Sequence, residues 1–164
     1  MYRPNMRQRS TAFATIVATL LMTTFAGACS RPDFEGPSWD DESGYALYEE
    51  GDVYLVVATT IKPGDGRAFR SQAEELAEQL RTQEGLVLFG YSGSVAEGTA
   101  QTLSVWRDAA SLAVFMVSEG HVSAVAAHSG NSEDFATDIW EIDGSDLPPT
   151  WDEADVRLAA VLAE

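Results

Sequence analysis

The 164-residue sequence contains a single cysteine, Cys29, and few basic residues. Because a disulfide needs two cysteines, none can form within the chain, and a hydrophobic core must hold the fold together. Ten Lys and Arg residues stand against 26 Asp and Glu residues, which gives a formal net charge of -16. Nucleic acid is therefore not an expected partner, since binding it requires many cations that neutralise phosphates.

The sequence also lacks a long apolar run near its start. A membrane-spanning helix needs about 20 apolar residues, whereas the uncharged run at residues 11–25 is shorter and contains five threonines. Arg3, Arg7 and Arg9 precede this run, and the small residues Ala26, Gly27 and Ala28 follow it. This three-part order is typical of a signal peptide. We therefore expect residues 1–28 to be removed and the protein to be exported.

Cys29 directly follows the expected cleavage point. The segment from Phe25 to Ser30 resembles the lipobox of bacterial lipoproteins, although Ala26 stands where that motif usually has Leu. The resemblance implies that the Cys29 thiol receives a diacylglycerol, which attaches the protein to a membrane at the cell surface or the periplasmic face. The alternative is an ordinary leader cleaved after Ala28, with Cys29 left as a free thiol.

The part of the chain after Cys29 divides into two regions. Residues 29–52 are rich in Pro, Gly and acidic side chains and predict a partly disordered tether. Its aromatic residues Phe34, Trp39, Tyr45 and Tyr48 indicate that part of it packs onto the domain. Residues 53–164 are expected to form that single domain.

Hydrophobic periodicity predicts the elements of this domain. Asp108 is expected to cap a helix that bends or divides near Gly120, and the pair Thr150 and Glu153 predicts a capping box. Strands are expected at 53–61, 86–91, 102–106 and 135–142, and helices at 66–85, 108–128 and 150–162.

The order of the elements before the last helix is βαββαβ, which predicts a ferredoxin-like α+β fold with a helix added at the C-terminus. Such a sheet is open and has its helices on one face. The other face must be covered, and we expect dimerisation to cover it.

Three segments of the sequence are similar to a known family: Lys62-Pro63-Gly64, the run from Thr102 to Asp108, and Ser118-Glu119-Gly120-His121. They resemble the antibiotic biosynthesis monooxygenase group of the dimeric α/β-barrel superfamily. The resemblance implies a homodimer and a pocket between sheet and helices. Some members of this superfamily are cofactor-free oxygenases of aromatic polyketides, and others bind or degrade heme.

His121 is the strongest catalytic candidate, because an imidazole can move a proton near neutral pH or bind heme iron. Its alternative role is structural, as a hydrogen bond to a backbone carbonyl where the helix bends. His128 lies seven residues further on and would share a helix face with His121. The remaining pocket candidates are Tyr91, Ser104, Trp106 and Phe115, of which Trp106 is first of all a core aromatic.

These observations lead to one hypothesis and two alternatives. The first is an exported, lipid-anchored domain that binds a small aromatic or planar molecule and acts as a cofactor-independent monooxygenase. The second is a non-catalytic module for heme or another hydrophobic small molecule. The third is a structural lipoprotein without a ligand. No metal site is expected, and heme is the one cofactor considered.

Overall fold

The computed structural model describes residues 34–94, 98–128 and 132–163, which fall in one compact unit. The expected signal peptide, residues 1–28, and Cys29 lie outside the described residues. The centre of the unit is an antiparallel sheet in the order β4-β5-β3-β6. Its strands are β3 (Val53–Pro63), β4 (Leu86–Ser94), β5 (Thr99–Trp106) and β6 (Ser132–Asp143).

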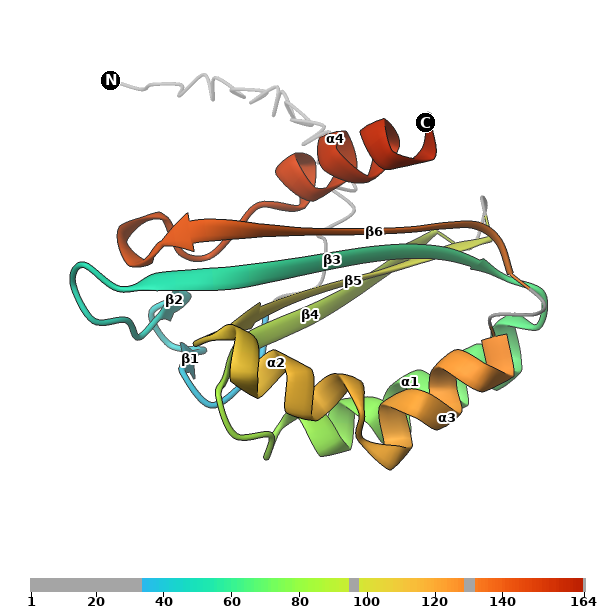
Figure 1. The fold of residues 1–164 in the computed structure, drawn as a ribbon, viewed down its shortest axis with the longest axis horizontal. Coiled ribbons are helices and arrows are strands. Elements are labelled where there is room, and N and C mark those ends of the chain that lie inside the picture. The colour runs from blue at the N-terminus through green and yellow to red at the C-terminus, as the bar shows by residue number, and fades with distance from the viewer. Residues whose placement is uncertain (1–33, 95–97, 129–131, 164) are drawn as a thin grey trace, which may run out of the picture. The chain divides into compact units, whose positions relative to one another are not determined.

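Helices cover both faces of this sheet (Figure 1). One face lies toward α1 (Gly66–Leu80), α2 (Ala109–Met116) and α3 (Glu119–His128), and we call it the inner face. The outer face lies toward α4 (Trp151–Leu162), and a short 3-10 helix, Gly144–Asp146, precedes α4. The order from β3 to β6 confirms the ferredoxin-like fold with an additional C-terminal helix.

Side chains of β3 alternate between the two faces, as a strand with both faces covered requires. Tyr54, Val56 and Ala58 are buried in the outer cluster, whereas Leu55 and Val57 pack against the inner one. Because β3 pairs with β5 on one side and β6 on the other, it is a central strand of the sheet. The β-branched run at residues 53–61 correctly predicted this strand.

The helices of the inner face begin at acidic caps. The Asp65 carboxylate accepts hydrogen bonds from the amides of Arg67 and Ala68 at 2.9 and 3.1 Å. The Asp108 carboxylate accepts one from the Ser111 amide at 2.7 Å, which confirms the predicted cap. The helical pattern that follows Asp108 is divided into α2 and α3, one of the two outcomes expected near Gly120.

The outer face is covered by elements of the same chain. Trp151, Ala154 and Leu158 of α4 are buried against it, together with Phe34 from the N-terminal side. Phe34 stacks on Trp151 with ring centroids 5.9 Å apart. Dimerisation was expected to cover this face, but α4 and the N-terminal segment occupy it; the homodimer itself stays a prediction.

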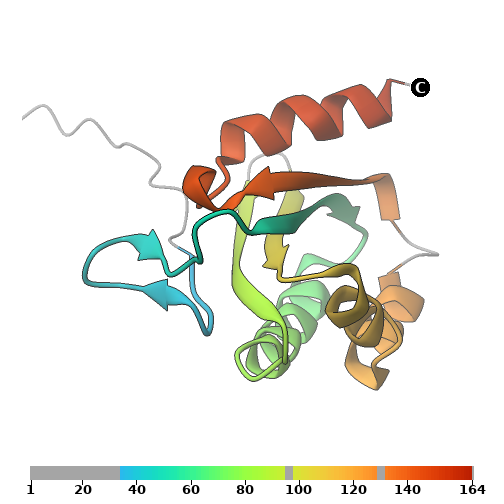
Figure 2. The ribbon, with the colours of Figure 1, turned by 60° about the vertical axis from the view of Figure 1, so that its left-hand side comes forward.

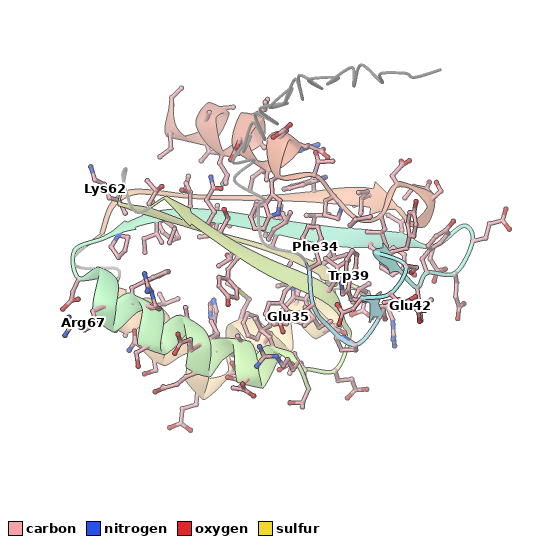
Figure 3. All side chains as sticks on the ribbon, turned by 180° about the vertical axis from the view of Figure 1, so that it is seen from behind. Phe34, Glu35, Trp39, Glu42, Lys62 and Arg67 are labelled. Atoms are coloured by element: carbon pink, nitrogen blue, oxygen red, sulfur yellow. The ribbon has the colours of Figure 1, made fainter. Side chains whose placement is uncertain are left out.

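The N-terminal segment adds a small hairpin of β1 (Trp39–Asp40) and β2 (Tyr45–Ala46) (Figure 2). Glu35 exchanges both backbone hydrogen bonds with Phe89, at 2.8 and 2.7 Å, so the segment also lines the edge of β4. Phe34 and Trp39 lie together beside the sheet (Figure 3), with ring centroids 5.6 Å apart. This part of the expected tether therefore packs onto the domain, as its aromatic residues indicated.

The start of α4 forms only half of the predicted capping box. The Thr150 hydroxyl accepts a hydrogen bond from the Glu153 amide at 3.2 Å. The Glu153 carboxylate instead accepts from Arg157, one turn further along, at 3.0 Å. The Arg157 guanidinium also lies 4.4 Å from the ring centroid of Trp140 and 3.5 Å from the Asp138 carboxylate, so it links α4 to β6.

Candidate functional site

A cavity of about 810 Å³ lies between the inner face of the sheet and helices α1, α2 and α3. Twenty of its 27 lining residues are apolar. Apolar side chains surround its opening, because several lining residues are also 46–61% exposed. These residues are Met116, Val122, Val125, Phe135 and Ile139. A concave, apolar site of this size with a few polar groups is typical of a small-molecule site.

The cavity brings together four of the predicted site residues: Tyr91, Ser104, Phe115 and His121. Tyr91 and Ser104 come from the sheet, whereas Phe115 ends the buried face of α2 and His121 lies in the first turn of α3. Tyr91 is 51% exposed, so this residue lies where the cavity meets the solvent. The two sheet residues and the two helix residues thus line opposite walls.

His121 makes the structural contact proposed as its alternative role and lines the cavity as well. Its Nδ1 lies 3.0 Å from the carbonyl oxygen of Met116, where α2 gives way to α3. A carbonyl oxygen only accepts, so Nδ1 carries the proton and Nε2 carries the lone pair in the neutral ring. Phe115 packs against the imidazole at 4.9 Å between ring centroids. The ring therefore has a fixed tautomer with a basic nitrogen.

Trp106 supports the cavity without lining it. Its side chain is fully buried, and its ring lies 5.0 Å from that of Phe115. The indole N–H donates to the Ser104 hydroxyl oxygen at 3.0 Å. Trp106 is thus a core aromatic that positions two lining residues. His128 ends α3, and its side chain is outside the described residues.

Sequence reasoning missed several polar residues of the cavity: Thr59, Gln72, Thr102 and Thr137. The Thr59 and Thr137 hydroxyl groups lie 3.0 Å apart, within hydrogen-bond distance. The Gln72 side-chain oxygen is buried and has no partner among the described residues. Threonines in three of the predicted strands were the available signal, but the sequence does not tell which face of each strand meets a cavity.

The side chains available in and around the cavity do not favour a metal ion or heme. In the described part of the chain, no group of three or more His, Cys, Asp and Glu side chains could hold a metal ion. Among the described lining residues, His121, Tyr91 and Met116 belong to residue types that ligate heme iron, but no Arg or Lys is present to pair with the propionates. The lining therefore does not support a heme site.

Acidic groups with altered pKa values lie outside the cavity lining. A hydrogen bond from the Ser43 hydroxyl is the main cause that lowers the pKa of Asp40. The backbone amide of Ser111 is the main cause that lowers the pKa of Asp108, the cap of α2. Both carboxylates thus serve local turns and caps rather than the cavity.

Comparisons with known proteins agree with this architecture. The model of the antibiotic biosynthesis monooxygenase family matches residues 52–127, from the start of β3 to the last turn of α3. The resemblance found in the sequence is thereby confirmed over this range, while β6 and α4 lie beyond it. No curated protein is similar to the chain at a significant level.

Solved structures of low sequence identity are similar to parts of this chain. A protein from Shewanella oneidensis has a TM-score of 0.51 and 13% identity, and the match covers 58% of this chain and 97% of that one. The cofactor-independent oxygenase SnoaB from Streptomyces nogalater has a TM-score of 0.46 and 16% identity, with 61% of this chain and 100% of that one covered. A conserved protein from Methanosarcina mazei has a TM-score of 0.49, 16% identity, and coverage of 54% and 91%.

No single helix in the described ranges has the length and apolar composition to cross a membrane, although the pair α2 and α3, bent by 60°, meets that test jointly.

Proposed function

We propose that the cavity between the sheet and α1–α3 binds a small, flat and mostly apolar molecule, and that the protein oxygenates it without a cofactor. The observation that carries this proposal is His121. A histidine of fixed tautomer lies in the wall of an apolar cavity of about 810 Å³, where its Nε2 can accept a proton. The family match over residues 52–127 gives further support.

The proposed reaction uses O₂ as the oxidant and an acidic C–H group of the substrate. His121 Nε2 takes the proton from a CH₂ group that lies between aromatic rings and opposite a carbonyl, which leaves a delocalised carbanion. The carbanion forms a C–O bond with O₂, and the resulting peroxide takes up a proton. Its O–O bond then breaks with loss of water, so that CH₂ and O₂ become C=O and H₂O. The apolar walls limit side reactions with bulk water.

Anthrone is a suitable probe, because its CH₂ group has this environment and its product is anthraquinone. We expect wild-type protein to accelerate O₂ uptake and anthraquinone formation above the rate without protein. His121→Gln should lose most of this acceleration, since Gln can still donate to the Met116 carbonyl but has no basic nitrogen. Equal rates for wild type, His121→Gln and buffer would contradict the oxygenase proposal.

Binding without turnover is the second candidate function. It is favoured by the small number of reactive groups, because His121 is the one imidazole among the described lining residues. Saturable binding of anthrone with no gain in O₂ uptake would support this candidate against the first. Heme binding is distinguished by adding hemin and recording the Soret band, where we expect no change that depends on His121.

Export and lipid attachment are proposed from the sequence pattern before Cys29. Mass spectrometry of the membrane fraction should find the N-terminus at Cys29 with a diacylglycerol adduct. Cys29→Ser should abolish the adduct and release the protein from the membrane. An unmodified terminus at another residue would contradict the proposal.

A homodimer is proposed from the family resemblance. Because α4 covers the outer sheet face, a dimer would use another surface or displace α4. Light scattering of the protein without residues 1–28 measures its mass directly, and a monomer at all concentrations would contradict the dimer.

A further inference from the structure

Four hydroxyl side chains form a row across the inner face of the sheet. Tyr91 of β4 is paired with Thr102 of β5, Thr102 is paired with Thr59 of β3, and Thr59 is paired with Thr137 of β6. Residues directly opposite each other in antiparallel strands present their side chains on the same face. All four line the cavity, so the hydroxyl row crosses its sheet wall from one edge strand to the other.

Mostly apolar side chains border the hydroxyl row on both sides. The neighbouring levels of the sheet consist of Phe89, Ser104, Val57 and Ile139 on one side, and of Ala100 and Ile61 on the other. These residues also line the cavity. A polar stripe one residue wide thus lies between two mostly apolar stripes.

The hydroxyl groups differ in what they already bind. Thr59 and Thr137 are half-buried, and their hydroxyl oxygens lie 3.0 Å apart. Tyr91 and Thr102 are exposed, and neither hydroxyl has a hydrogen-bond partner in the part of the chain that the structure describes. A hydroxyl group can donate one hydrogen bond and accept others. The β4 and β5 half of the row is therefore free to bind a ligand.

We propose that the hydroxyl row sets the specificity of the cavity, by binding the edge of a flat apolar molecule that carries several oxygen atoms on that one edge. Neighbouring strands lie about 4.8 Å apart, so the backbones of the four residues follow one another at roughly that interval. The Thr59 and Thr137 hydroxyl oxygens approach one another to 3.0 Å. The apolar stripes contact the rest of the molecule. This inference rests on the proposed function for the location of the ligand and adds the chemical class that is bound.

Two isomers of dihydroxyanthraquinone test the inference. The 2,7 isomer carries both hydroxyl groups and one carbonyl oxygen on the same long edge, whereas the 2,6 isomer divides its oxygens between the two edges. Size, composition and apolar surface are the same in both. Fluorescence titration of the protein without residues 1–28 should give a dissociation constant on the order of tenfold lower for the 2,7 isomer, as about one or two additional hydrogen bonds predict.

Substitution at Thr102 isolates the contribution of the hydroxyl row. Thr102→Val keeps the shape of the side chain and should bring the ratio of the two dissociation constants close to one, with little change for the 2,6 isomer. Thr102→Ser restores the hydroxyl and should restore the preference. Thr60→Val is the matched control, because Thr60 is the next residue of β3 after Thr59 and is buried toward the outer face. It should keep the wild-type ratio, and thermal melting checks that each variant is folded.

The outcomes separate this inference from the proposed function. Tight and equal binding of both isomers, or a preference that Thr102→Val leaves unchanged, would overturn the role of the hydroxyl row while the cavity remains a ligand site. Binding of neither isomer would overturn both the row and the proposed site. A preference lost in Thr102→Val and kept in Thr102→Ser and Thr60→Val supports the row.

Discussion

The indole N–H of Trp106 donates a hydrogen bond to the hydroxyl oxygen of Ser104, at a distance of 3.0 Å. Trp106 is fully buried, whereas Ser104 lines the cavity, so this bond connects the core to the wall of the site. One lone pair of Ser104 is occupied by the indole, and its own O–H remains available to donate. A serine that lines the cavity is thus also a partner for a buried donor.

Replacement of Ser104 tests this connection. Ser104→Ala leaves the Trp106 N–H buried without a partner, and we expect it to lower the free energy of unfolding by about 1–3 kcal/mol in urea denaturation. In a Trp106→Phe background the same change should cost clearly less, because no indole donor remains. An equal cost in both backgrounds would show that the bond does not contribute.

Leu158 should anchor α4 to the outer face of the sheet. Its side chain is 2% exposed, so Leu158→Ala is expected to lower the free energy of unfolding by roughly 2–5 kcal/mol. Val156 lies on the same helix and is 73% exposed, so Val156→Ala should change the stability by less than about 0.5 kcal/mol. Similar effects of the two changes would contradict the docking of α4.

Gly85 is expected to tolerate no side chain where the chain enters β4. Its φ is +79°, and a Cβ there would lie 2.2 Å from the Ser111 Cβ. Gly51 has a similar φ of +88° with open space around it, so it is the matched control for backbone strain alone. Thermal melting should show a larger loss of stability for Gly85→Ala than for Gly51→Ala. Equal losses would mean that Ser111 moves aside freely.

The Asp108 cap predicts a dependence of stability on pH. The Ser111 amide lowers the pKa of Asp108, so the carboxylate contributes stability above its ordinary value of about 3.9, and this contribution falls as the pH drops through the lowered pKa. Asp108→Ala should melt at a lower temperature than wild type at pH 7, and the difference should shrink on acidification below pH ~4. A difference that stays constant with pH would assign the effect to something other than the charged cap.

The sequence predicted the fold well because its main elements have strong local patterns. The β-branched run of β3, the amphipathic pattern of α1 and the Asp108 cap are all found. The β1–β2 hairpin was missed, since strands of two residues have no periodicity. The segment just before the hairpin contacts α4 through Phe34 and Trp151, which lie far apart in the sequence.

The candidate site was predicted less completely, because its composition depends on which strand face meets the helices. In β4 a register shift between Leu86 and Leu88 breaks simple alternation, and Val87 and Leu88 are both buried in the outer cluster. The face of Tyr91 could not be derived from the sequence for this reason. The alignment of Thr59, Thr102 and Thr137 depends on the pairing register of three strands, which no single segment encodes.

The most direct test of the central claim is a methyl NMR titration with 2,7-dihydroxyanthraquinone. The claim is that the ligand enters the cavity on the inner face of the sheet, where Val57, Ile61 and Ile139 present their methyl groups. We predict saturable shifts of these three signals, with those of Val56 and Leu158 on the outer face unchanged. An absence of shifts, or shifts confined to Val56 and Leu158, would contradict the claim.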